Sequence, residues 1–190
     1  AFPLLRELYY LGDFIAKEAY FDEILDRYYR GSDTVREYIR NDEYGYNTIP
    51  REKELGLIDD SDDLDVILEI EEQFGIKAHL WLHGGTIVFD LEKGKIVELQ
   101  FRSRENPQWH LPDCVQRLKN LKRLDIYGRK NEVIKEIPDW IGVFPNLREL
   151  EIDLPCVSTL PNTLGNLTEL KSLSITLPNL EKLLDTIGNL

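Results

Sequence analysis

LKNLKRLDI (118–126), FPNLRELEI (144–152) and LTELKSLSI (167–175) are three copies of one nine-residue block. A fourth copy starts at Leu190, so the block starts lie 26, 23 and 23 residues apart. A fixed period in the twenties, with leucines at fixed offsets, is typical of proteins in which small units stack on one another. The sequence therefore predicts a solenoid over the second half of the chain.

Each block contains the pattern of a short strand. In the second block, Leu150 and Ile152 alternate with Glu149, Glu151 and Asp153, which is the period of a strand with one buried face. The other copies, including an earlier one in KIVELQF (95–101), place apolar residues on the buried side: Ile96, Leu99, Phe101, Leu124, Ile126, Leu173 and Ile175. Because such short strands are unstable alone, we expect them to stack in parallel over one shared core.

The segments between the blocks must carry the chain back to the start of the next strand. IPDWIGVF (137–144) and LPNTLGNL (160–167) each hold a proline and a glycine at the same offset. Glycine adopts a positive φ at low cost, and we expect Gly142 and Gly165 to use this freedom. Short helical or 3-10 turns are predicted in these segments rather than long helices.

The stretch LPNTLGNLTELKSLSI (160–175) resembles the LPxxIGNLxxLxxLxL pattern of the 23-residue class of leucine-rich repeat proteins. The resemblance implies an α/β fold, a right-handed solenoid with a parallel, concave β-sheet. It also implies a scaffold, adaptor or sensor role in which the concave strands bind a protein partner. The chain departs from the family at Pro155 and Pro178, where the family usually places an asparagine that bonds backbone amides.

The amino-terminal part of the chain predicts helices. Leu4, Leu8, Leu11 and Ile15 form an apolar stripe at helical spacing, so we expect residues 3–30 to form two helices or one bent helix. The many tyrosines and phenylalanines of this stretch are expected in its core.

Further helices and a hairpin are expected before the repeats. A short helix should follow to Arg40, then a loop over 41–60, then a helix from about Asp62 to Phe74. TIVFDLEKGKIVELQF (86–101) predicts a β-hairpin that seals the open end of the repeat core.

The predicted organisation therefore has three parts. They are an acidic helical domain over 1–78, a hairpin cap with the first repeat strand over 79–101, and repeats over 102–190 that we expect to be truncated at Leu190.

The composition narrows the classes of partner. The formal net charge is −12, and the first hundred residues carry all of the excess, with 23 acidic and 11 basic side chains. Such a surface repels the phosphates of duplex nucleic acid. It is compatible with a basic protein partner, or with a surface that is merely well solvated. The sequence contains no apolar run as long as a membrane helix, so no membrane partner is expected.

The cysteine content points to a compartment. Cys114 and Cys156 lie far apart, without the closely spaced pairs of secreted repeat proteins. This pattern favours a reducing environment, and we expect a cytoplasmic protein.

Two sequence features invite a metal site. The run IDDSDDLD (58–65) resembles the start of a calcium loop, but Leu64 and Asp65 stand where an oxygen ligand and a glycine are needed. The run is better explained as an acidic helix start. His79 and His83 lie four residues apart, but nothing nearby supplies the third ligand that zinc requires. We therefore predict no metal site.

Catalytic motifs are not evident. The sequence holds no glycine-rich phosphate loop, serine elbow or paired-carboxylate motif, and neither cysteine has a neighbouring histidine. We therefore expect no enzyme and no cofactor.

The outward positions of the strands form the predicted binding site. They make three columns across the four strands, with Tyr127 as the one aromatic residue. The first column is Glu98, Arg123, Glu149 and Ser172; the second is Gln100, Asp125, Glu151 and Ser174; the third is Arg102, Tyr127, Asp153 and Thr176. Extended concave surfaces of this kind are what solenoids use for binding.

Three functions remain open at this point, the last of which is catalysis by the acidic helical domain itself. The first is a non-catalytic protein–protein interaction module. The second is the recognition segment of a larger signalling enzyme, such as a kinase, GTPase or ubiquitin ligase, because the chain ends at Leu190, where a further repeat block should begin.

Overall fold

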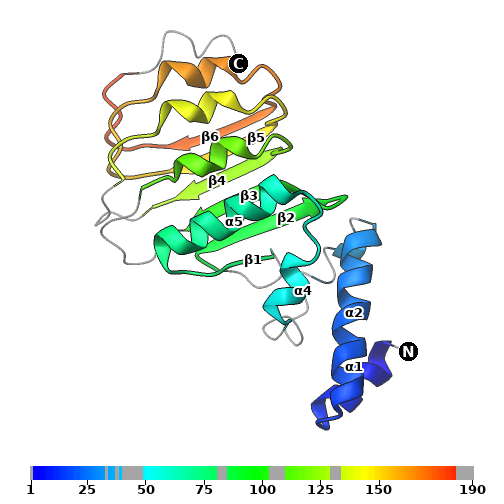
Figure 1. The fold of residues 1–190 in the computed structure, drawn as a ribbon. Helices are drawn as coiled ribbons and strands as arrows, with labels where there is room; N and C mark the ends of the chain where they lie inside the picture. The colour runs from blue at the N-terminus through cyan, green and yellow to red at the C-terminus, as the bar shows by residue number, and fades with distance from the viewer. Residues whose placement is uncertain are drawn as a thin grey trace. The chain divides into compact units, whose positions relative to one another are not determined.

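The structure is a computed structural model with an α/β fold, a six-stranded, mostly parallel sheet accompanied by short helices (Figure 1). It describes residues 2–32, 34–36, 39, 49–80, 85–102, 110–128 and 134–182. The chain divides into two compact units, Ala1–Lys53 and Glu54–Leu190. This division falls earlier than the boundary expected at residue 78.

The first unit is built on two helices, α1 (Phe2–Tyr10) and α2 (Phe14–Arg30). Gly12 separates them and adopts a φ of 88°, a backbone conformation that suits glycine. Asp13 caps α2, and its carboxylate accepts a hydrogen bond from the Ala16 amide at 2.9 Å. The expectation of two helices or one bent helix is therefore confirmed as two helices.

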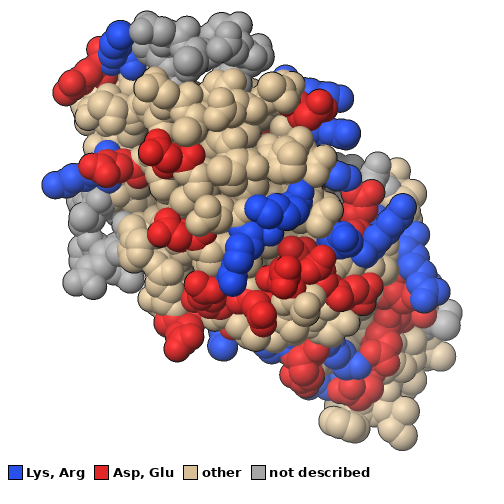
Figure 2. All heavy atoms as spheres, turned by 45° about the horizontal axis from the view of Figure 1, so that its top comes forward, with Lys and Arg blue, Asp and Glu red and all other residues tan. Residues whose placement is uncertain are grey.

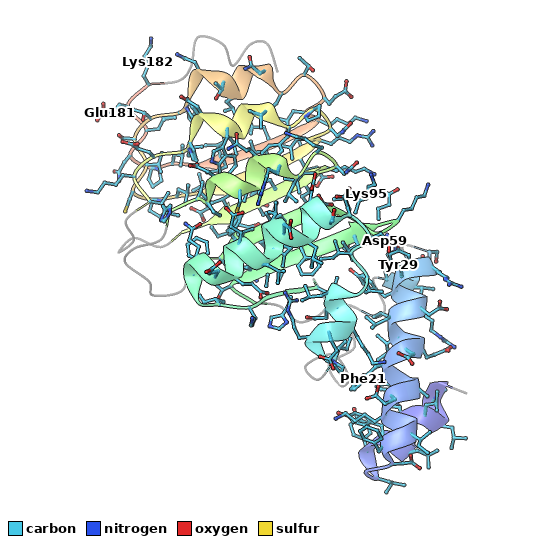
Figure 3. The ribbon with its side chains drawn as sticks, in the orientation of Figure 1. Phe21, Tyr29, Asp59, Lys95, Glu181 and Lys182 are labelled. Carbon is cyan, nitrogen blue, oxygen red and sulfur yellow. The ribbon has the colours of Figure 1, made fainter. Side chains whose placement is uncertain are left out.

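The core of the first unit is aromatic. Tyr20 and Phe21 on α2 are fully buried (Figure 3). The ring of Tyr9 on α1 stacks on Tyr20 at 5.6 Å and meets the edge of Phe21 at 5.7 Å. Such pairs add to the stabilisation that burial gives, so the aromatic core predicted from the sequence is confirmed for these rings. It is wrong for Tyr10 and Phe14, which are 51 and 71% exposed.

The apolar stripe predicted for this unit is wrong. Leu4, Leu11 and Ile15 are 64, 82 and 80% exposed. α1 ends at Tyr10 and α2 begins at Phe14, so Leu11 and Ile15 do not continue the face of α1 on which Leu4 lies.

Two helices occupy the beginning of the second unit. The short α4 (Arg51–Leu55), which contains the division between the units, lies within the segment predicted as a loop, so the loop prediction is wrong there. The predicted fourth helix is confirmed as α5 (Ser61–Phe74). Asp60 caps its start, and Gly75 ends it with a φ of 63°.

The six strands follow one another in the sheet in the order of the sequence. They are β1 (Ala78–Leu80), β2 (Ile87–Glu92), β3 (Lys95–Arg102), β4 (Arg123–Tyr127), β5 (Glu149–Asp153) and β6 (Ser172–Thr176). β2 and β3 form the predicted antiparallel hairpin, and β3 to β6 are parallel. β1 pairs in parallel with the other side of β2, and it is this pairing that the sequence did not predict.

Two buried carboxylates fasten α5 to the sheet. Asp63 accepts a hydrogen bond from the Ile96 amide of β3 at 2.8 Å. Glu71 accepts one from the Ala78 amide of β1 at 2.9 Å. Burial raises the pKa of Asp63. The acidic run before α5 thus serves the helix start and the sheet, and α5 belongs to the second unit rather than to a separate helical domain.

Three 3-10 helices form the return segments, as predicted. They are η3 (Asp113–Arg117), η4 (Asp139–Val143) and η5 (Asn162–Asn166), and each directly follows a proline. Trp140 of η4 is buried, and its indole nitrogen donates a hydrogen bond to Asp113 of η3 at 3.1 Å. Neighbouring return segments are therefore held together by side chains as well as by the strands.

Gly142 serves a different purpose from the one predicted. The described glycines with a positive φ are Gly12, Gly75 and Gly94, so the prediction is wrong for both Gly142 and Gly165. A Cβ atom on Gly142 would lie only 2.0 Å from the backbone oxygen of Thr163 in η5. Glycine is needed here because two return segments approach closely.

The apolar side chains of the strands lie one above another. The registers align Leu99, Leu124, Leu150 and Leu173 across β3 to β6. The first three are at most 2% exposed, whereas Leu173 is half-buried. Among the described residues, β6 has a strand on one side only, so its core residues are covered from one side.

The close contact at Gly142 makes a stability prediction. We expect Gly142→Ala to lower the free energy of unfolding by about 1–3 kcal/mol, because η4 or η5 must shift to admit the Cβ atom. Urea denaturation measures the effect. Val143→Ala, at a neighbouring position that is 44% exposed, is the control and should change little. Equal effects of the two substitutions would contradict the packing role of Gly142.

Candidate functional site

One face of the sheet is covered by α5 and the 3-10 helices, as Figure 1 shows. The opposite face of β3 to β6, which we call the open face, carries the outward side chains. The registers align these residues in three rows: Glu98, Arg123, Glu149 and Ser172; Gln100, Asp125, Glu151 and Ser174; and Arg102, Tyr127, Asp153 and Thr176. The structure therefore brings together all twelve predicted site residues, and their role in binding stays a prediction.

Two of the twelve residues are not accessible. Gln100 is 2% and Asp125 is 1% exposed. The amide of Gln100 donates a hydrogen bond to Asp125 Oδ2 at 3.0 Å. The sequence pattern places both residues on the open face but does not reveal that they are buried there. They can support a binding surface without forming its contact layer.

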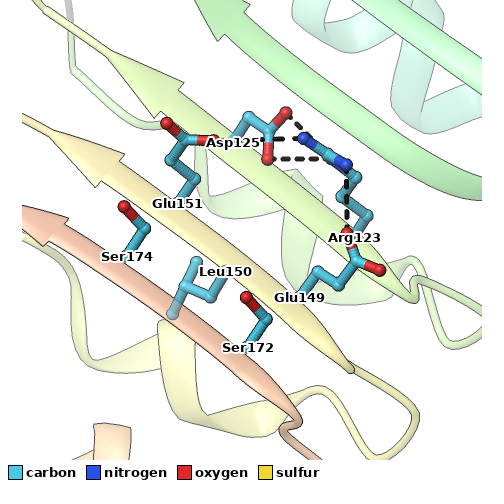
Figure 4. Close-up of a pocket in the computed structure, with 7 residues that line it drawn as sticks. All are labelled: Arg123, Asp125, Glu149, Leu150, Glu151, Ser172 and Ser174. Atoms are coloured by element: carbon cyan, nitrogen blue, oxygen red, sulfur yellow. Dashed lines mark hydrogen bonds and ion pairs between the residues drawn. The ribbon is translucent and has the colours of Figure 1, made fainter.

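Arg123 is the centre of the charge arrangement on the open face (Figure 4). Its Nε donates to both carboxylate oxygens of Asp125, at 3.1 and 3.0 Å, and its Nη1 donates to Glu149 at 3.0 Å. A third carboxylate, that of Glu151, lies 3.9 Å from Nη2. The side chain thus joins β4 to β5 and stands among three acidic groups.

Burial and the neighbouring charges act in opposite directions on the pKa values of Arg123 and Asp125. Burial disfavours the charged form of Arg123, yet Asp125 and Glu149 raise its pKa overall. For Asp125 burial is the stronger influence, and its pKa is raised despite the hydrogen bonds from Arg123 and Gln100. The ionised Asp125 is therefore maintained at a desolvation cost.

Tyr127 contacts two charged side chains of the open face, Arg102 and Glu151. Its ring lies 5.6 Å from the guanidinium carbon of Arg102, a cation–π distance. Burial, followed by a hydrogen bond with Glu151, raises the pKa of Tyr127 to about 12. The phenol therefore keeps its proton at neutral pH and can donate it to the Glu151 carboxylate. Tyr127 is half-buried rather than fully exposed.

A hollow of about 190 Å³ lies over β4, β5 and β6. Seven residues line it: Arg123, Asp125, Glu149, Leu150, Glu151, Ser172 and Ser174 (Figure 4). Its depth comes from the difference between the long glutamates of β5 and the short serines of β6. All lining residues except Leu150 were predicted, and Leu150 was assigned to the core by its alternation. The hollow forms because long and short side chains lie next to each other on adjacent strands. These residues are far apart in the sequence, so the sequence alone does not predict the hollow.

The described residues contain no group of three or more histidine, cysteine or acidic side chains that could hold a metal ion. His79 Nδ1 instead lies 3.1 Å from the buried carboxylate of Glu54, whereas His83 lies outside the described residues. Neither Cys114 nor Cys156 forms a disulfide. Burial raises the pKa of the Cys114 thiol to about 11, so this thiol is poorly suited to nucleophilic chemistry at neutral pH.

The charge distribution is mixed on the side shown in Figure 2. Acidic and basic atoms lie interspersed, and a broad uncharged area occupies the upper part of the view. Within the described part of the chain, no helix has the length and apolar character needed to cross a membrane. A scan against protein-family models and a search of curated proteins both give no match to this chain.

The raised pKa of Asp125 predicts a pH effect. In the folded protein this carboxyl keeps its proton to a higher pH than its ordinary value of 3.8. Its contribution to the free energy of unfolding therefore falls as the pH rises from that value through the raised pKa, and stays low above it. Asp125→Asn does not titrate, so its stability relative to the wild type should rise over this window and then level off.

Urea denaturation at a series of pH values measures this difference. Asp139→Asn, which removes one charge from an exposed position of η4, is the control. A difference between Asp125→Asn and the wild type that is flat, or that falls as the pH rises, would contradict the raised pKa.

Proposed function

We propose that this chain is a leucine-rich repeat protein whose open face binds a protein partner without catalysing a reaction. The proposal is supported by the repeating unit, a short strand followed by a proline and a 3-10 helix. It is also supported by the aligned leucines of successive strands, which share one core. In this proposal the strands and returns form a right-handed solenoid, capped at its start by the β2–β3 hairpin.

The observation that carries the binding proposal is the register of polar side chains on the open face. The strands β4, β5 and β6, which come from successive repeats, and β3 before them present their outward residues in register. Such a surface grows with every unit and follows the curvature of the stack, which is how repeat proteins obtain extended binding surfaces.

The residues at the middle of the surface suit an interface. Tyr127 and Arg123 belong to the residue types that most often dominate the free energy of protein binding. Both are held in place before any partner arrives, Arg123 by Asp125 and Glu149, and Tyr127 by Arg102 and Glu151. Pre-organised side chains lose less conformational entropy on binding.

A matched pair of double variants tests the proposed surface. Tyr127→Ala with Glu151→Lys alters the open face, and Gln116→Ala with Asp139→Lys alters exposed positions on the helical side. Far-UV circular dichroism and thermal melting establish that each variant is folded. The immobilised wild-type chain is used to capture binding proteins from a cell lysate. Each captured protein is then purified, and its affinity for the wild type and for both variants is measured.

We expect the open-face variant to bind the captured partner at least about 30-fold more weakly, because central interface residues contribute roughly 2 kcal/mol or more. The helical-side variant should bind like the wild type, and hydrogen exchange of β4 to β6 should slow when the partner is present. If both variants bind equally well, the open face is not the binding surface.

A further inference from the structure

We propose that the hollow over β4, β5 and β6 receives a lysine or arginine side chain from a basic segment of the partner. This inference rests on the proposed function, because it names the chemistry of the partner that the open face binds. The argument starts from the balance of charge on the open face and then turns to the shape of the hollow.

The open face carries an excess of negative charge. Its twelve residues include five carboxylates, Glu98, Asp125, Glu149, Glu151 and Asp153, against two guanidinium groups, a difference of −3. The excess is largest at the hollow, where three carboxylates surround the single cation of Arg123. A cationic partner is attracted to such a surface, and like charges are repelled.

The positive charge of Arg123 does not face the hollow freely. Its Nε is shared between the two oxygens of Asp125, and its Nη1 is directed at Glu149. Two of the three nitrogens of this guanidinium thus donate to carboxylates of the protein itself, and the third lies 3.9 Å from Glu151. The side chain neutralises Asp125 and leaves the remaining acceptors of the two glutamates for another cation.

Glu149 and Glu151 have acceptor capacity to offer. Each carboxylate can accept about four hydrogen bonds, and their side chains are 53 and 38% exposed. They stand two residues apart on β5, so they point to the same face at a spacing of about 7 Å. A guanidinium or ammonium group between them is within reach of both carboxylates.

The opposite wall of the hollow is made by two serines. Ser172 and Ser174 of β6 pair in register with Glu149 and Glu151, and both are exposed. Their hydroxyls add acceptors for a bound cation. The short serine side chains leave open a space that longer side chains at these two positions would fill. A group from solvent can therefore enter the hollow.

The size of the hollow suits a single side chain. Pockets for drug-sized ligands are usually about 300–1,000 Å³, and this one is about 190 Å³. Phosphate groups are disfavoured by the surrounding carboxylates. Among the described residues no metal-binding group is found that would make an inorganic cation the expected occupant. The occupant that fits both charge and size is the end of a basic side chain.

Labelled octalysine and octaarginine peptides are the probes, and octaglutamate of the same length is the negative control. Binding to the full chain is measured by fluorescence anisotropy at low and at high salt. Glu149→Gln with Glu151→Gln removes two charges from the hollow with little change of shape. Glu136→Gln with Asp139→Asn removes two charges from exposed positions elsewhere and controls for the net charge of −12.

We expect the hollow variant to weaken binding of the basic peptides about tenfold or more, and the control variant to weaken it less than about twofold. Ser172→Arg, which fills the hollow with a cation of the protein's own, should weaken binding to a similar degree. Octaglutamate should not bind. Equal weakening by the hollow and control variants overturns the proposal, because binding would then follow net charge alone.

The outcome with the captured partner separates this inference from the proposed function. If the partner binds at the open face but substitution of its lysines and arginines has no effect, the basic-segment proposal fails and the proposed function stands. If the partner binds elsewhere, both fail. If sedimentation instead shows a dimer that the hollow variant dissociates, the occupant is a second copy of this chain and the basic-segment proposal is overturned.

Discussion

The register between consecutive parallel strands is the constraint on which the rest of this structure depends. Leu124, Leu150 and their counterparts must meet at the same height, because each five-residue strand buries its apolar side only against its neighbours. Slipping one strand by a single residue would exchange its buried and exposed faces. Backbone hydrogen bonds at the strand entries support the alignment, as between the Arg148 amide and the Lys122 oxygen at 2.8 Å.

The same register decides what the open face looks like. Since the outward residues repeat their heights as strictly as the leucines do, acidic side chains from different strands become neighbours. Arg123 lies among them and offsets part of their repulsion, and Asp125 remains buried beside it at a cost in desolvation. The register that aligns the core leucines therefore also sets the charge pattern that we propose for partner binding, and Arg123 neutralises part of its negative charge.

Acidic residues have two separate uses in this protein. Asp63 and Glu71 on α5 accept hydrogen bonds from strand amides in buried surroundings, and they attach α5 to the sheet. The glutamates of β5 are partly exposed to solvent: Glu149 pairs with Arg123, and Glu151 lies near Arg123 and accepts a hydrogen bond from Tyr127. The extent of burial and the hydrogen-bond partner of each carboxylate, rather than its residue type, distinguish the acidic residues that support the fold from those that are available to a ligand.

The repeat period by itself determined the strands from Lys95 onward, their parallel order, the 3-10 returns and the membership of the three rows. These follow from the alternation of side chains and from the spacing of the blocks, which are properties of a linear pattern. The tertiary structure alone decided that Gln100 and Asp125 are covered and that a hollow lies beside Ser172. It also showed that Gly142 is required by a neighbouring backbone, and that the stripe from Leu4 to Ile15 is broken at Gly12. Each of these features depends on atoms that are far apart in the sequence or on a backbone angle. Side chains of adjacent strands come into contact only when the strands pack side by side in the folded protein.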